Sequence, residues 1–251
     1  MPERVSILGI PVDALDMHSA LAAVDAHIQH ATQPGYILAV NPEKVFAVKS
    51  NLEMMDFFSR ATLLLPDGIG VVWAARTLYN VDIHRVPGAD LMLNIVALSS
   101  KKGYKLFIYG AQEEVNKKAC EILSDRFPGI EICGRANGYL PARDMKDLAS
   151  SINRSGADIL FVALGSPRQE NWICEHLDKL TVKICQGIGG TLDTITGNVK
   201  RAPRLYQKLG LEWFYRLLRQ PSRLSRQSVY PLFVLRILQE KFLKSHKQAR
   251  P

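Results

Sequence analysis

Hydrophobic and polar residues along the chain form two alternating kinds of segment. Short runs rich in Ile, Val and Leu are separated by longer stretches in which apolar residues recur three and four positions apart. The short runs are Val5–Ile10, Tyr36–Val40, Leu63–Leu65, Lys105–Tyr109, Ile130–Cys133, Ile159–Leu164 and Val182–Gln186. The longer stretches are Ser19–Ile28, Pro42–Lys49, Leu91–Ser99, Glu113–Arg126, Ala142–Asn153 and Arg168–Leu177. This alternation predicts an α/β fold with a largely parallel sheet and helices on both faces.

The charge divides the chain near Val199. Residues 200–251 contain thirteen Lys and Arg but only two acids, Glu212 and Glu240, and therefore carry a net charge of +11. The whole chain carries +8, which leaves −3 for residues 1–199. We therefore expect an α/β core, residues 1–198, and a basic amphipathic appendage, residues 199–251.

Apolar residues accompany the charges of the appendage, which favours an anionic membrane surface as its partner. Each Lys or Arg near an anionic leaflet contributes about 1 kcal/mol, and an amphipathic helix adds its buried apolar face. The longest apolar stretch, Val229–Leu238, is interrupted by Pro231 and Arg236 and is shorter than the roughly 20 residues that span a bilayer. One alternative is a tail whose helices simply pack on the core. Nucleic-acid binding is disfavoured, because Leu and Val rather than stacking aromatics lie among the charges.

The composition predicts an ordinary soluble domain with a full core, since 47% of the 251 residues are hydrophobic. Residues 1–10 lack the basic region, long apolar run and cleavage site of a secretion signal, so we expect a cytoplasmic location. Together with an appendage on an anionic membrane surface, this predicts a peripheral place on the inner face of the cell membrane. The four cysteines have neither CxxC nor CxxH spacing, which predicts reduced thiols without disulfides or zinc.

Glycine and polar residues follow five of the predicted strands, where ligands of open parallel sheets bind. These segments are Asn41-Pro42-Glu43-Lys44, Pro66-Asp67-Gly68-Ile69-Gly70, Gly110-Ala111-Gln112, Gly165-Ser166-Pro167-Arg168-Gln169-Glu170 and Gly187-Ile188-Gly189-Gly190-Thr191-Leu192-Asp193. Glycine lets the backbone approach a ligand closely, and a helix N-terminus suits a phosphate. The pattern predicts a nucleotide-type ligand, although any single glycine here is equally typical of a tight strand-to-helix turn.

Several familiar sites are missing from the sequence. It contains neither the GxGxxG fingerprint nor a GxxxxGK[ST] loop, which argues against hydride transfer and NTP hydrolysis, and no GxSxG elbow of a triad hydrolase. No Asp-x-Asp triplet is present to anchor a metal. We therefore expect no metal and no cofactor, with Arg, Lys and helix dipoles neutralising a diphosphate.

Seven segments occur in the order found in a known family. They are Val40-Asn41-Pro42-Glu43-Lys44, Pro66-Asp67-Gly68-Ile69-Gly70, Arg85-Val86-Pro87-Gly88-Ala89-Asp90, Gly165-Ser166-Pro167-Arg168-Gln169-Glu170, Gly187-Ile188-Gly189-Gly190-Thr191-Leu192-Asp193, Gly197-Asn198-Val199-Lys200-Arg201-Ala202-Pro203 and Gly210-Leu211-Glu212-Trp213. From Ile7 to about Arg226 the chain resembles the WecG/TagA/CpsF glycosyltransferases, glycosyltransferase family 26. The resemblance implies a Rossmann-like core and an inverting transfer from a UDP-sugar to an undecaprenyl-diphosphate-linked acceptor. It places this reaction at the cytoplasmic face of a bacterial membrane, in cell-surface polysaccharide synthesis.

The resemblance also implies roles for single residues. Inverting transfer needs a general base for the acceptor hydroxyl, and Asp67 matches the family's proposed base, with Asn41 holding sugar hydroxyls. Without the resemblance, Asp67 before Gly68 is as well explained as a turn or cap residue. Candidates to offset the UDP charge are Arg85, Arg216, Arg223 and Arg226, the last three closing over the site when the appendage docks. Gln169 is implied as an active-site contact, and Gly110, Gly187 and Asp193 as parts of the nucleotide pocket.

The donor sugar stays open. Many relatives have Thr where this chain has Ala39, a departure that does not separate N-acetylmannosamine, the first expectation, from its uronic acid or from glucose. A different class of function, a catalytically silent nucleotide-sugar-binding subunit of a membrane complex, is disfavoured because Asn41, Asp67, Arg85 and Gln169 are all present. The acceptor, the linkage position, the polysaccharide pathway and self-association as a homo-oligomer are also open.

Overall fold

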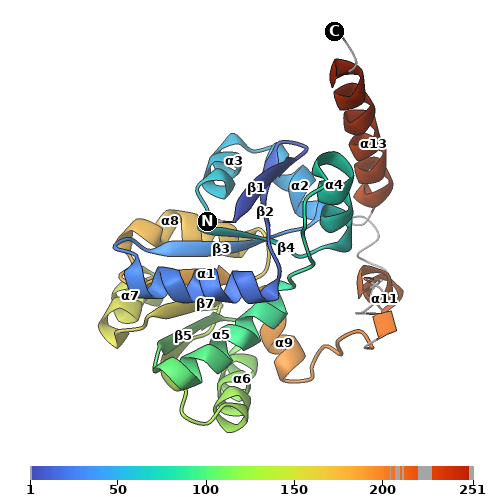
Figure 1. Cartoon of the computed structure of the whole chain (residues 1–251). Helices are drawn as coiled ribbons and strands as arrows, with labels where there is room; N and C mark the ends of the chain where they lie inside the picture. The colour runs from blue at the N-terminus through green and yellow to red at the C-terminus, as the bar shows by residue number, and fades with distance from the viewer. Residues whose placement is uncertain (1, 204, 207–209, 211, 220–227, 249–251) are drawn as a thin grey trace.

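A computed structural model of the chain describes residues 2–203, 205–206, 210, 212–219 and 228–248. Its main feature is a six-stranded sheet with the strand order β4-β3-β8-β7-β5-β6, in which all neighbouring strands are parallel. The strands are β3 (Gly35–Val40), β4 (Leu63–Pro66), β5 (Lys105–Gly110), β6 (Glu131–Ala136), β7 (Ile159–Ala163) and β8 (Ile184–Gly187). Helices lie on both faces of the sheet (Figure 1). The predicted α/β fold is confirmed.

Successive strand residues pack into opposite layers, as the two-residue period of a strand requires. For example, Ile37 and Leu63 belong to one buried cluster and Leu38 and Leu64 to the other. The first cluster is covered by α1 (Met17–His30), α5 (Gly88–Lys102), α6 (Glu113–Arg126) and α9 (Thr191–Ile195). The second is covered by α2 (Pro42–Lys49), α3 (Leu52–Ser59), α4 (Ile69–Tyr79), α7 (Ala142–Ser155) and α8 (Arg168–His176), after which the 3₁₀ turn η1 (Leu177–Lys179) follows. Burial on both faces explains the continuous apolar runs.

The first apolar run differs from the prediction. Val5–Ile10 was expected to form one strand, but the chain folds there into a separate antiparallel hairpin of β1 (Glu3–Ile7) and β2 (Ile10–Ala14). Leu8 and Gly9 form the turn with φ angles of 52° and 92°. Leucine is unusual at positive φ, so the apolar pattern did not reveal the turn. The hairpin lies against β4, where the Asp13 carboxylate accepts a hydrogen bond from the Leu64 N–H at 2.8 Å.

The C-terminal region contributes α11 (Glu212–Arg219) and α13 (Val229–Gln248). One face of α13 packs on α2 and α4, because Phe233 and Ile237 are buried in the second cluster. The end of α13 points away from the sheet (Figure 1). Leu235, Leu238 and Phe242 are exposed. The alternative in which tail helices pack on the core therefore describes one face of α13. No helix in the described part of the chain is long and apolar enough to cross a membrane.

Candidate active site

Three neighbouring strands end at the candidate site. The order β4-β3-β8 brings together the residues that follow them, Asp67, Asn41 and the Gly187 loop. Asn41 caps α2, since its Oδ1 accepts a hydrogen bond from the Lys44 N–H at 2.9 Å. A Cβ atom added at Gly68 would lie 3.3 Å from Asn41 Cβ. The loops after β3 and β4 are thus in contact, and glycine permits their close approach.

Asp67 is held at the sheet edge by backbone groups. Its N–H donates to the carbonyl oxygen of Val40 at 3.1 Å, and its Oδ1 accepts from the Gly88 N–H at 3.2 Å. Gly88 is the first residue of α5, and the positive end of a helix dipole stabilises a nearby negative charge. The half-buried carboxylate is therefore kept at one position, as a general base requires.

Arg85 lies directly beside Asp67. Its Nε donates to the Asp67 carbonyl oxygen at 3.0 Å. Its guanidinium also forms an ion pair with Glu212, the first residue of α11, whose side chain is buried. Arg201 Nε lies 3.6 Å from the other Glu212 oxygen. The fold thus brings together Asp67 and Arg85, which were predicted separately. The appendage adds the Glu212 carboxylate, which pairs with Arg85.

Gln169 belongs to a buried group that links α8 to the loop after β8. Its Oε1 accepts from the Gly189 N–H at 2.8 Å, and its Nε2 donates to Glu170 Oε1 at 3.2 Å. Lys44 Nζ lies 2.5 Å from the same Glu170 oxygen. Burial alone raises the pKa of Glu170, but the Lys44 charge and the hydrogen bonds outweigh it and hold the pKa below its ordinary value. Gln169 thus supports the loop after β8, and a substrate contact stays a prediction.

Comparison with known proteins decides the family. The sequence profile of the Glycosyl transferase WecG/TagA/CpsF family matches residues 5–247. The chain belongs to this family. It is similar to the N-acetylglucosaminyldiphosphoundecaprenol N-acetyl-beta-D-mannosaminyltransferase of Bacillus subtilis, with 34% identity over 246 residues, 98% of this chain and 95% of that protein. A Bacillus spizizenii protein of the same name is 34% identical over 233 residues, 91% of this chain and 90% of its own. The chain is therefore a glycosyltransferase, as the motifs predicted.

Two of the glycines predicted for the nucleotide pocket of this glycosyltransferase lie where a side chain would meet neighbouring atoms, backbone at Gly110 and the Gln169 side chain at Gly187. Gly110 has a φ of 120°, and a Cβ there would lie 2.4 Å from the Ala163 carbonyl oxygen. A Cβ at Gly187 would lie 2.6 Å from Gln169 Nε2. Gly187 lies at the end of β8, whereas Gly110 ends β5, on the far side of β7. Their roles toward a nucleotide stay predictions.

The remaining predicted residues are placed less completely. Asp193 lies half-buried in the first turn of α9, near the Gly187 loop. Arg216 belongs to α11, but its side chain is outside the described part of the structure. Arg223 and Arg226 lie outside the described residues. Nowhere within the described ranges do three His, Cys, Asp or Glu side chains gather so that they could hold a metal ion.

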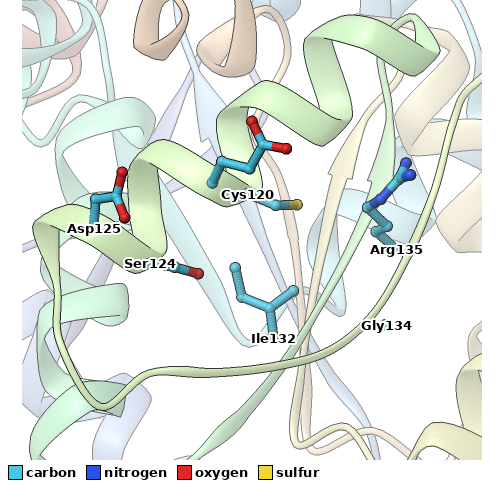
Figure 2. Close-up of a pocket in the computed structure, with 7 residues that line it drawn as sticks. Cys120, Ser124, Asp125, Ile132, Gly134 and Arg135 are labelled. Carbon is cyan, nitrogen blue, oxygen red and sulfur yellow. The ribbon is translucent and has the colours of Figure 1, made fainter.

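A cavity of about 680 Å³ lies elsewhere, between α6 and the edge strand β6. Figure 2 shows Cys120, Ser124 and Asp125 on the helix, with Ile132 and Arg135 on the strand across from them. None of the predicted site residues lines it. Burial raises the pKa of the Cys120 thiol to about 11, which makes it a poor nucleophile. The cavity and the predicted site residues therefore lie in different parts of this glycosyltransferase.

Sequence reasoning gave no role to three charged residues beside the site. Lys44 and Glu170 stand within the predicted motifs, and Glu212 is one of the two acids of the appendage. Their partners lie more than a hundred positions away along the chain. All three stand within the quoted motifs, and Glu212 is in addition an isolated acid in a strongly basic segment.

Proposed function

We propose that this glycosyltransferase moves an N-acetylmannosamine-type sugar, with inversion, from a UDP-sugar to the sugar of an undecaprenyl-diphosphate-linked acceptor. The observation that carries this proposal is the position of the Asp67 carboxylate, which accepts a hydrogen bond from the Gly88 N–H. Arg85 lies beside it and donates a hydrogen bond to the Asp67 carbonyl oxygen. Both Bacillus relatives are named for transfer of N-acetylmannosamine to an acceptor of this kind. Because each match covers at least 90% of this chain and of the relative, it supports proposing the same reaction for this chain.

In the proposed reaction, the acceptor hydroxyl attacks the anomeric carbon of the donor from the face opposite UDP. Its proton passes to Asp67 as the new bond forms. The bond to the diphosphate breaks, and its electron pair leaves with UDP. Arg85 offsets this charge, and Arg216, Arg223 and Arg226 are proposed to assist it. The absence of an Asp-x-Asp sequence supports a transfer that needs no metal.

We infer that position 39 contributes to donor choice. Ala39 is at the end of β3, and a Cβ added at Gly88 would lie 3.7 Å from Ala39 Cβ. Position 39 is thus adjacent to the helix N-terminus that binds Asp67. The names of the relatives favour N-acetylmannosamine, while its uronic acid and glucose stay as alternative donors. Asn41, Gln169, Gly187, Gly110 and Asp193 complete the proposed substrate site.

We also propose that α13 holds the enzyme reversibly on an anionic membrane surface. Phe233 and Ile237 attach one face to the core, whereas Leu235, Leu238 and Phe242 project from the opposite side. The cations of residues 199–251 would bind lipid headgroups while this apolar face enters the interface. Because α13 supplies core residues, the appendage is better tested by surface substitutions than by deletion.

The reaction is tested by UDP release from a panel of UDP-sugars, with N-acetylglucosaminyl-diphosphate-lipid as acceptor. We expect release with UDP-N-acetylmannosamine and undiminished release in excess EDTA. Loss of turnover in EDTA that Mg²⁺ or Mn²⁺ restores would contradict metal independence. UDP binding without release from any donor would instead favour a silent nucleotide-sugar-binding subunit.

Membrane binding is tested by sedimentation with vesicles that contain anionic lipid. Replacing Leu235, Leu238 and Phe242 together by Ser should lower the bound fraction several-fold, roughly as expected for removing apolar interfacial contacts. UDP release with a short-chain, water-soluble acceptor should stay near the wild-type rate. Leu52→Ser, at an exposed leucine of α3, is the matched control. Unchanged sedimentation of the triple variant would contradict the role of α13.

A further inference from the structure

The two acids of the basic appendage have different surroundings. Glu240 forms an ordinary i,i+4 ion pair with Lys244 on α13, at 3.1 Å, and both side chains are partly exposed. Glu212 is only 7% exposed and forms ion pairs with residues that precede α11 in the chain. A buried carboxylate is stable only when it is paired. The position of Glu212 therefore depends on two arginines, Arg85 and Arg201.

The two arginines are held differently. Arg201 donates two hydrogen bonds to Asp90, at 2.5 and 2.8 Å, so Asp90 already determines its orientation. Its distance to Glu212 is 3.6 Å, longer than a hydrogen bond. Arg85 instead contacts Glu212 directly and donates its Nε to the Asp67 carbonyl oxygen. Glu212 and the Asp67 backbone thus fix two nitrogens of the planar Arg85 guanidinium.

We propose that Glu212 is a positioning residue, which holds the Arg85 guanidinium at the site where the UDP diphosphate departs. The inference rests on the proposed function. Glu212 need not touch either substrate, because it acts through Arg85. A donor for developing charge is most effective when its orientation is set before the reaction. An arginine side chain has many rotamers, and a buried carboxylate on a second element restricts them.

This arrangement also makes the active site depend on α11. Glu212 opens that helix, 127 positions after Arg85, so Arg85 is oriented only when the start of α11 is seated on the core. The appendage was expected to bring cations to the site. At the start of α11 the appendage instead supplies an anion, the Glu212 carboxylate, which orients the Arg85 guanidinium of the core.

The test is a double-mutant cycle on the full chain, with kcat for UDP release as the readout. We expect Glu212→Gln to lower kcat about tenfold in the wild-type background, because a misplaced catalytic group is costly. In the Arg85→Gln background the same change should alter kcat less than about twofold, since residues that act through one another are not additive. Thermal unfolding of each variant shows whether it is folded.

The matched control is Glu240→Gln, which removes the other acid of the appendage and should leave kcat within about twofold of wild type. An equal loss from Glu212→Gln in both backgrounds would show a merely structural role and overturn the inference. A faster Glu212→Gln enzyme would show that Glu212 competes with the diphosphate, which also overturns it. A wild-type protein that releases no UDP from any donor would instead contradict the proposed function on which the inference rests.

Discussion

The carboxyl edge of β3, β4 and β8 and the cavity between α6 and β6 both contain carboxylates and an arginine, yet they differ in how these charges are held. At the sheet edge, Glu170 and Glu212 are 2% and 7% exposed and pair with Lys44 and Arg85. At the cavity, Arg135 pairs with Glu113 at 2.7 Å, and both side chains are substantially exposed. The charges of the sheet edge are therefore buried, whereas those of the cavity are exposed.

The difference lies in how the two regions are assembled. The ion pairs at the sheet edge join residues 126 and 127 positions apart, whereas the cavity is formed by α6 and the strand that follows it. Buried charges require partners with well-defined geometry, which several elements must supply together. Convergent buried charge thus accompanies the predicted site residues, and perturbed buried charges of this kind are typical of functional sites.

The strongest test of this comparison is the same substitution in each region. Asp67→Asn keeps the size of the side chain but removes its basicity, so we expect kcat to fall roughly 10²-fold or more, with UDP affinity little changed. Asp125→Asn, at the exposed rim of the cavity, should leave kcat within about twofold of wild type. Steady-state UDP release measures both. An active Asp67→Asn enzyme would assign the base to another residue, with Glu43 and Asp90 next in line.

The second test concerns stability. Lys44→Met leaves the buried Glu170 carboxylate without its cation, so we expect the free energy of unfolding to fall by about 3 kcal/mol. Lys117→Met, at an exposed position of α6, should change it by less than about 0.5 kcal/mol. Urea denaturation gives both values. Adding Glu170→Gln to Lys44→Met should recover part of the loss, and simple additivity of the two changes would contradict a coupled pair.

The third test uses pH. The pKa of Glu170 lies below its ordinary value of 4.5, so the folded protein binds this proton less readily than the unfolded chain. The stability that Glu170 contributes is therefore complete above pH 4.5 and is lost as the pH falls from there through the lower, folded-state pKa. The difference in unfolding free energy between wild type and Glu170→Gln should shrink below pH 4.5. A constant difference for Glu170→Gln across this range would contradict the assignment.

The smallest effect is expected from the cavity arginine. Arg135→Gln removes an exposed ion pair with Glu113, and exposed pairs contribute little. We expect kcat and the KM for the donor to stay within about twofold of wild type. A loss of activity comparable to that of Arg85→Gln would give the cavity a part in the reaction and remove the distinction between the two regions.

Sequence pattern predicted most of the sheet and the helices with long apolar periodicity. It missed the Leu8–Gly9 turn, since Leu8 has no turn signature, and it did not predict α3 or α4. Asp67 and Arg85 were identified through motifs, and the structure places them in contact. No roles were predicted for Lys44, Glu170 and Glu212, because each acts through an ion-pair partner that only folding brings near.

By itself the sequence determined the α/β class, the carboxyl-edge location of the glycine and polar motifs, the family and the opposite charges of core and appendage. These properties depend on local periodicity, composition and motif order, which can be read along the chain. Tertiary structure alone decided which face of α13 is buried and which carboxylates lose contact with water. It also decided that an acid of the appendage pairs with an arginine of the core. Burial and ion pairing depend on distances between segments far apart in the chain, and no local pattern encodes those distances.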